Sequence, residues 1–227
     1  MKITSSYGIE IKQMNKIFRP TVAIYNDAIS FCVAVFENEW VNIETLDTMQ
    51  RKHYAERLIH TTKNNKAKYD FDGKFYKMPS YMRRSVINTA LGYLSSYHSH
   101  LDNWKSNGCI GRKPTYQRQH NQFPTFYKDN MYVADSIKSD TVQLKLYVNN
   151  DWKWVTVKLK HTDMQYIRKH LQNTKMSVPT LEKKHHKWYL RFAFEEEVKL
   201  NATNREPNHI GSRPWYQYRC YLFSNEK

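Results

Sequence analysis

The 227-residue sequence is poor in the residues that usually interrupt or cross-link a chain. It has six glycines, seven prolines and three cysteines. So little glycine and proline excludes a collagen-like or low-complexity chain. Cys32, Cys109 and Cys220 are odd in number and contain no Cys-x-x-Cys pair. This argues against a disulfide framework and is typical of proteins in a reducing cytosol.

Long apolar runs are scarce as well. The longest, from Ile29 to Phe36, is interrupted by Ser30 and is too short to cross a bilayer. The first residues lack the charged, apolar and small-residue regions of a signal peptide. We therefore expect a cytoplasmic protein with no membrane partner.

Positive charge and aromatic side chains are what the sequence has in excess. It contains 36 Lys and Arg against 21 Asp and Glu, which gives a formal net charge of +15, together with 17 Tyr, 10 Phe and 6 Trp. The cations are spread along the chain, most densely after Gly111. Cations neutralise phosphates, and flat rings stack on unpaired bases. We expect a nucleic-acid partner; the alternative is a soluble basic protein without one.

The spacing of apolar residues predicts an α+β chain. Residues 7–12 alternate as in a strand, after which apolar residues recur every three or four positions, as in helices. The predicted helices cover residues 18–36, 45–60 and 80–107. Ser80 is the expected N-cap of the last helix, and Met49 is expected to face inward in the second. Residues 61–77 are polar and are predicted to form a loop.

After Gly111 the period changes to two, which predicts strands. The expected hairpins pair residues 142–148 with 152–159 and residues 178–183 with 188–194, with a short helix at 162–172 between them. Asn149 and Asn150 suit the first turn. The most economical architecture returns the first strand to this later sheet.

No catalytic motif stands out. The sequence has no phosphate-binding Gly-rich loop, no GxSxG and no HExxH. His185 and His186 lack cysteine or carboxylate partners at ligand spacing, so we predict a solvated turn, with a metal site as the alternative. Glu195 to Glu197 could serve as paired carboxylates for a metal ion or for acid–base catalysis. They are consecutive in a strand, however, and point to opposite faces, so they cannot all converge on one ion, and we predict an acidic cluster at the end of the strand. We predict no catalytic residue, no metal ligand and no cofactor in this chain.

Candidate nucleic-acid-binding residues lie in two places. Arg83 and Arg84 fall in the first turn of a predicted helix, where the helix dipole disfavours cations; this suggests an external anion, or else plain surface arginines. The stretch 111–128 is basic, aromatic and rich in amides, and Phe123 and Phe126 in it either stack on bases or anchor the loop. The predicted binding residues are Arg83, Arg84, Arg112, Lys113, Tyr116, Arg118 and Lys128, with the cations on phosphates and Tyr116 on a base.

Three local features resemble the N-terminal part of the TnpB (OrfB) family of transposon-associated proteins. They are the entry strand that leads into the helix with Asn26-Asp27, the Gly111–Pro114 segment that runs into Phe123–Phe126, and the strand Lys187–Glu195. The match covers roughly residues 5–200. The resemblance implies the part of a transposase-labelled, RNA-guided DNA endonuclease that binds guide RNA and DNA but lacks the catalytic residues.

The resemblance also implies an OB-like β-barrel wedge domain with an inserted helical bundle. Residues 1–16 would be the first barrel strand, 17–110 the helical recognition insertion, 111–200 the rest of the barrel and 201–227 a disordered, irregular tail. The family's nuclease uses Mg and Zn, and its first Asp-x-Gly motif is missing where the tail begins. Read one nucleotide later, the tail can encode a similar motif, so we interpret it as out of frame.

Two alternative functions remain open at this point. One is a nonfunctional truncated transposase that needs a missing domain to fold, which predicts that Trp188, Phe192 and Phe194 are exposed in this chain. The other is an active metal-dependent nuclease that uses scattered carboxylates, among which Glu196 is the residue to test.

Overall fold

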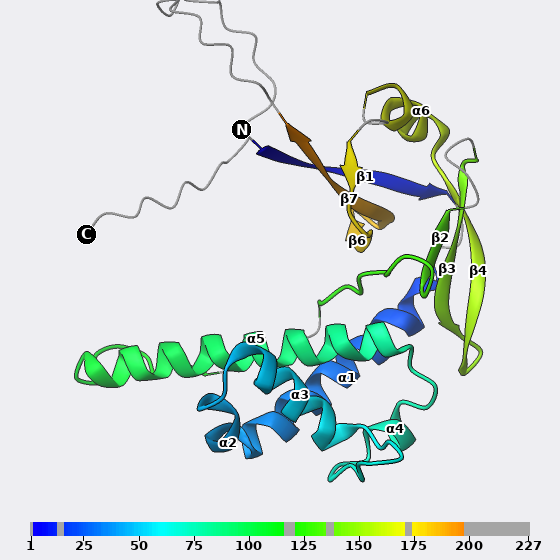
Figure 1. Ribbon diagram of the computed structural model, residues 1–227. Coiled ribbons are helices and arrows are strands. Elements are labelled where there is room, and N and C mark those ends of the chain that lie inside the picture. Colours follow the sequence, from blue (N-terminus) through cyan, green and yellow to red (C-terminus); the bar gives the residue numbers. More distant parts are fainter. Residues whose placement is uncertain (1, 13–15, 116–120, 135–138, 171–173, 198–227) are drawn as a thin grey trace, which may run out of the picture.

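The structure is a computed structural model that describes residues 2–12, 16–115, 121–134, 139–170 and 174–197. A curled antiparallel sheet forms half a barrel, and the first five helices lie together to one side of it (Figure 1). The mixture of helices and strands confirms the α+β class. The predicted tail, 201–227, lies outside the described residues.

Six helices and seven strands make up the described part of the chain. The helices are α1 (Phe18–Asn38), α2 (Trp40–Glu44), α3 (Thr48–Ile59), α4 (Phe71–Lys74), α5 (Ser80–Ser106) and α6 (His161–His170). The strands are β1 (Lys2–Lys12), β2 (Tyr132–Ala134), β3 (Thr141–Val148), β4 (Asp151–Leu159), β5 (Lys175–Met176), β6 (Thr180–Lys184) and β7 (Lys187–Glu197). Among these helices, none is both long and apolar enough to span a bilayer.

Strand β1 joins the two halves of the sheet. Residues 2–10 pair with β7, whereas Ile11 and Lys12 pair with β4. The strand order is β2-β3-β4-β1-β7-β5, with β6 also paired to β7. The predicted return of the first strand to the later sheet is therefore confirmed, and the strand begins earlier than its alternation indicated.

Both predicted hairpins are confirmed, and each turns on two residues with positive φ. Asn149 and Asn150 have φ of 52° and 59°, and His185 and His186 have φ of 45° and 66°. Two consecutive residues in this region are typical of a type I′ turn, whose twist matches that of the strands. The two histidines are exposed at the tip of their hairpin.

Helix α1 begins against the sheet and then runs along α5 (Figure 1). The Phe18 ring lies 5.3 Å from the Trp188 ring. Thr21 is buried, and its hydroxyl accepts a hydrogen bond of 2.9 Å from the backbone N–H of Tyr147. The helical and sheet parts of the molecule are thus fastened together at the first turns of α1.

The helix predicted over 45–60 is interrupted by a cap. Helix α2 ends at Glu44, and Asp47 caps α3 by accepting hydrogen bonds from the N–H groups of Met49 and Gln50 at 2.8 and 2.9 Å. Met49 therefore lies in the first turn of α3 and is 61% exposed, so its predicted inward orientation is wrong. The predicted cap of α5 is also shifted, because Pro79 precedes the helix and Ser80 is its first residue.

The segment 61–77 packs against the helices and is more than the predicted loop. It contains α4, and both Phe71 and Phe75 are buried. Each of their rings lies 5.8 Å from the ring of Phe31 on α1. Polar residues predominate around these two aromatic side chains. The periodicity of apolar residues therefore did not predict that they are buried.

One cluster of buried apolar side chains extends through helices and sheet. Strand β3 contributes Val142, Leu144 and Leu146 to it. Strand β7 contributes Trp188, Phe192 and Phe194, which are 3%, 1% and 1% exposed. The exposure of these aromatic side chains, predicted under the truncated-transposase alternative, is therefore wrong, because the chain's own sheet and helices cover them.

Candidate nucleic-acid interface

The two arginines in the first turn of α5 point in different directions. Arg83 is 9% exposed, and its guanidinium lies 3.6 Å from Glu56 and 3.8 Å from Asp72. Arg84 has a side chain that is 58% exposed, 3.9 Å from Glu56 and 5.6 Å from the Tyr81 ring. Internal carboxylates therefore face Arg83, which corrects its predicted place on a phosphate-binding surface. Arg84 remains accessible.

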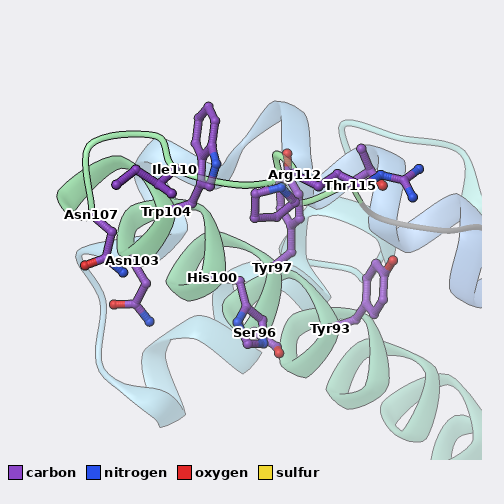
Figure 2. A pocket seen from close by; sticks show the side chains of 11 residues that line it. Tyr93, Ser96, Tyr97, His100, Asn103, Trp104, Asn107, Ile110, Arg112 and Thr115 are labelled. Carbon is purple, nitrogen blue, oxygen red and sulfur yellow. The ribbon is translucent and has the colours of Figure 1, made fainter.

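The chain reverses its direction directly after α5. Gly108, Cys109 and Gly111 have φ of 70°, 61° and 85°, a region that glycine enters without a steric penalty. The Trp104 indole N–H donates a hydrogen bond of 3.3 Å to the Gly111 carbonyl, and the Cys109 N–H donates one of 3.0 Å to the Trp104 carbonyl. The segment up to Thr115 consequently runs back beside the helix (Figure 2).

A groove of about 390 Å³ lies between this returning segment and α5 (Figure 2). We call it the α5 groove. The helix provides aromatic and amide side chains, and the returning segment provides Arg112. Among the described residues that line it, none carries a carboxylate. The lining residues used below are Tyr93, Tyr97, His100, Asn103, Trp104, Asn107 and Arg112.

The structure brings together only part of the predicted basic segment. Arg112 lines the α5 groove, and Lys113 is exposed beside it. Lys128 is exposed ahead of β2. Tyr116 and Arg118 lie outside the described residues.

The chain leading to Phe126 is held by a buried side chain of α1. The Asn26 Oδ1 accepts a hydrogen bond of 3.0 Å from the Gln122 N–H, and its Nδ2 donates one of 2.9 Å to the Gln122 carbonyl. Phe126 is fully buried, and the Phe123 ring lies 6.1 Å from that of Trp188. Of the two roles considered for these phenylalanines, the structure supports anchoring.

The structure also reveals a basic surface that the sequence analysis did not single out. The register pairs Lys145 with Trp154, Gln143 with Thr156 and Lys12 with Lys158 on the face of β1, β3 and β4 that points away from the buried cluster. We call these six residues the sheet face. Since both strands of the β3–β4 hairpin were predicted, their alternation was the signal that could have found it.

The sheet face combines an accessible ring with three lysines. Trp154 is 42% exposed, and the Lys145 ammonium lies 5.9 Å from its ring centroid. Lys12 and Lys158 are direct cross-strand neighbours, a placement that is unfavourable for like charges. Lys12 lies 3.8 Å from Glu10, whereas within the described ranges neither Lys145 nor Lys158 pairs with a carboxylate.

Several carboxylates near the sheet are engaged in ion pairs. Glu10 lies 3.0 Å from the Lys187 ammonium, Asp140 lies 2.7 Å from Arg168, and Glu182 lies 2.6 Å from Arg191. A hydrogen bond from Lys187 holds the pKa of Glu10 below its usual value, against the raising effect of burial. In the part of the chain that the structure describes, no group of three or more His, Cys, Asp or Glu side chains is placed to hold a metal ion.

The carboxylates at the end of β7 are only partly described. Glu195 is exposed and lies 3.9 Å from the Lys175 ammonium. The side chain of Glu196, the residue singled out for the nuclease alternative, lies outside the described part. The alternative therefore stays a hypothesis without a described cluster of metal ligands around it.

The fold and these surfaces define an α+β protein with a basic, partly aromatic exterior. Its residues 5–148 match the model of the Aq_aa04 family, and the chain belongs to that family. No curated protein matches it. The matched range contains the α5 groove, Lys12 and the β3 residues of the sheet face.

Proposed function

We propose that this protein binds nucleic acid, principally RNA, and that the sheet face contacts a single-stranded segment of it. The observation that carries the proposal is the accessible Trp154 ring with Lys145 beside it, on a sheet face whose far end carries Lys12 and Lys158. Lysines pair with the phosphates, while a base stacks on the ring. The net charge of +15 attracts the polyanion from a distance.

The finer form of the proposal is a role like that of the N-terminal part of TnpB proteins, which holds guide RNA and DNA without cutting them. Two features support it: the sheet curls into half a barrel, and α1 to α5 lie between β1 and β2 in the chain. An OB-like wedge barrel with a helical recognition insertion would have its elements in this order. Sequencing the gene across and beyond the codons for residues 201–227 tests this form. We expect a RuvC-type nuclease continuation in a shifted frame, and a continuation of any other kind contradicts it.

Salt dependence of binding tests the sheet face itself. In fluorescence anisotropy with a labelled single-stranded RNA of about 15 nucleotides, we expect the affinity of the native chain to fall steeply with salt. Replacing Lys145 and Lys158 by alanine removes two phosphate contacts. Each contact to a single strand contributes about 0.7 to the slope of log K against log salt, so the slope should decrease by about 1.4.

The matched control removes the same charge elsewhere. Lys153 is exposed on β4 but points to the opposite side from Lys158, and Lys63 is exposed between α3 and α4. The Lys63→Ala/Lys153→Ala variant should keep the native slope. Equal slopes for the two double variants would contradict a localised site, and an affinity that ignores salt would contradict the electrostatic mechanism altogether.

The same titration reports the role of the ring. Replacing Trp154 by alanine should weaken binding roughly 5- to 150-fold, since one stacked base contributes about 1–3 kcal/mol. Phenylalanine at this position should keep most of the affinity. Tyr76, which is 69% exposed and lies on the helical side, provides the control: its replacement by alanine should leave binding unchanged.

A further inference from the structure

The α5 groove has a lining that the sheet face lacks, a row of rings along one helix. Tyr93, Tyr97, His100 and Trp104 follow one another at intervals of four, three and four residues. This spacing places them on the same side of α5, and all four line the groove (Figure 2). The groove therefore offers flat surfaces against which a planar ligand can stack.

Polar groups stand around these rings. Asn103 and Asn107 line the groove from the end of α5, and each amide can both donate and accept hydrogen bonds. Arg112 lines it from the returning segment (Figure 2). A volume of about 390 Å³ lies in the range of small-ligand sites and is sufficient for one nucleotide unit.

The charge around the groove selects for an anion. Arg112 is a permanent cation, Lys113 is exposed next to it, and no lining residue is a carboxylate. The nearby Asp102 lies 3.5 Å from the Lys105 ammonium, which offsets its charge. A fitting ligand is therefore planar, carries hydrogen-bonding groups at its edge and bears a negative charge beside the plane.

We propose that the α5 groove binds one unstacked base of the bound strand, with the Arg112 guanidinium on the adjoining phosphate. This inference rests on the proposed function and assigns it a second contact. The base lies among the rings of α5, and the amides of Asn103 and Asn107 bond to its edge. Proline-rich peptides also bind aromatic grooves, but they do not account for a guanidinium in a lining free of carboxylates.

A strand of about 15 nucleotides containing 2-aminopurine tests the inference, because the fluorescence of this base falls when it stacks. Binding to the native chain should quench the probe at one or a few positions of the strand. The Trp104→Ala variant should lose that quenching, and Trp104→Phe should keep it, although both lack the hydrogen bond to Gly111. The phenylalanine variant thereby separates loss of the stacking ring from loosening of the returning segment.

The role of the cation has a matched control elsewhere on the surface. Arg112→Ala should weaken binding about tenfold, the effect of a charge-assisted hydrogen bond worth about 1.4 kcal/mol. Lys63→Ala removes the same charge from an exposed residue between α3 and α4 that does not line the groove, and its effect should be about twofold at most. Both variants are compared at the same salt concentration as the native chain.

The outcomes separate this inference from the proposed function. Equal affinities of the Arg112 and Lys63 variants, or quenching that survives Trp104→Ala, overturn the groove site and leave the sheet face standing if its own variants behave as expected. A native chain that binds no strand overturns both. A proline-rich peptide that occupies the groove while 2-aminopurine stays bright also overturns the inference.

Discussion

At the scale of single residues, Glu39 shows how the helical part of the molecule is held together. Its side chain is 8% exposed, pairs with the Lys68 ammonium and accepts hydrogen bonds from the Tyr69 hydroxyl at 2.8 Å and the Asn42 amide at 3.3 Å. The hydrogen bond from Lys68, followed by that from Tyr69, holds the pKa of Glu39 below its ordinary value of 4.5, against the effect of burial. The carboxylate thereby fastens the segment 61–77 to the end of α1.

Glu39 makes the stability of the fold depend on pH in the acid range. Because the folded pKa of Glu39 lies below the unfolded one, its contribution is complete above about pH 4.5 and is lost as the pH falls through the folded value. Glu39→Gln should destabilise the chain by about 1–3 kcal/mol at neutral pH. Urea unfolding is followed by circular dichroism between about pH 7 and 3. As the pH falls, the free energy of unfolding should decrease less for the variant than for the native chain.

Other carboxylates also make the fold less stable in acid. The test is therefore the difference between the native chain and the variant in how stability changes with pH. The pKa values of Glu10, Asp140 and Glu182 are also lowered, so the native chain and the variant both lose stability in acid. Parallel curves for the two proteins would show that Glu39 titrates alike in the folded and unfolded chain.

At the scale of elements, the β6–β7 hairpin carries an avoidable cost. Its turn holds two histidines at positive φ, where the β-carbon of an ordinary residue is crowded. The β3–β4 hairpin solves the same problem with two asparagines, which tolerate this region better. Strand β7 nevertheless pairs with β1, β5 and β6, so the sheet enforces the turn.

Replacing this turn should stabilise the protein. His185→Asn with His186→Gly supplies the residues that a type I′ turn favours, and we expect a gain of about 0.4–1 kcal/mol. For a chain of this size that corresponds to roughly 1–4 °C in Tm, measured by differential scanning calorimetry. The double alanine variant, which keeps the crowded β-carbons, should show no gain. A gain of equal size in both would place the effect outside the turn.

At the scale of the whole molecule, the high positive charge lowers the stability of the fold but favours binding of nucleic acid. A net charge of +15 on 227 residues means that folding brings like charges together. Salt screens this repulsion over about 10 Å at 0.1 M. The same ions compete with the protein for phosphates and lower its affinity for nucleic acid.

We therefore expect the Tm to rise between about 0.02 and 0.3 M sodium chloride while the affinity for a single strand falls. The Lys145→Ala/Lys158→Ala variant, with two positive charges fewer, should show a smaller rise in Tm. Thermal unfolding followed by circular dichroism measures it. A Tm that falls with salt would show that ion pairs such as that of Glu39 and Lys68 outweigh the general repulsion.

The sequence predicted those elements in which local pattern and burial agree. Residues 18–36 repeat their apolar positions over many turns, and the strands of the two hairpins largely alternate, so both signals are strong. Phe71 and Phe75 are buried by contacts with Phe31, which lies far away in the chain, and no local period announces such contacts. Tertiary packing therefore decided what composition alone had assigned to a loop.

The candidate site was predictable in its chemistry and less so in its location. Arg112 and Lys113 were found because they stand in a visibly basic segment, and both are accessible. Arg83 is equally basic in sequence, but carboxylates from α3 and the turn of α4 draw it inward. The sheet face depends on cross-strand register, which brings Lys12 beside Lys158 although most of the chain separates them.

The position of β1 has a consequence for the order in which the chain folds during synthesis. Ile9 pairs with Leu190, and all five helices of the helical part lie between them. Helices α1 and α5 can pack on each other as soon as both have left the ribosome, whereas residues 2–10 of β1 must wait for β7. Until then the nascent chain presents an open strand edge, the kind of surface that pairs with other chains. Stalled synthesis before Trp188 would accordingly release a chain with formed helices and a first strand whose residues 2–10 are unpaired.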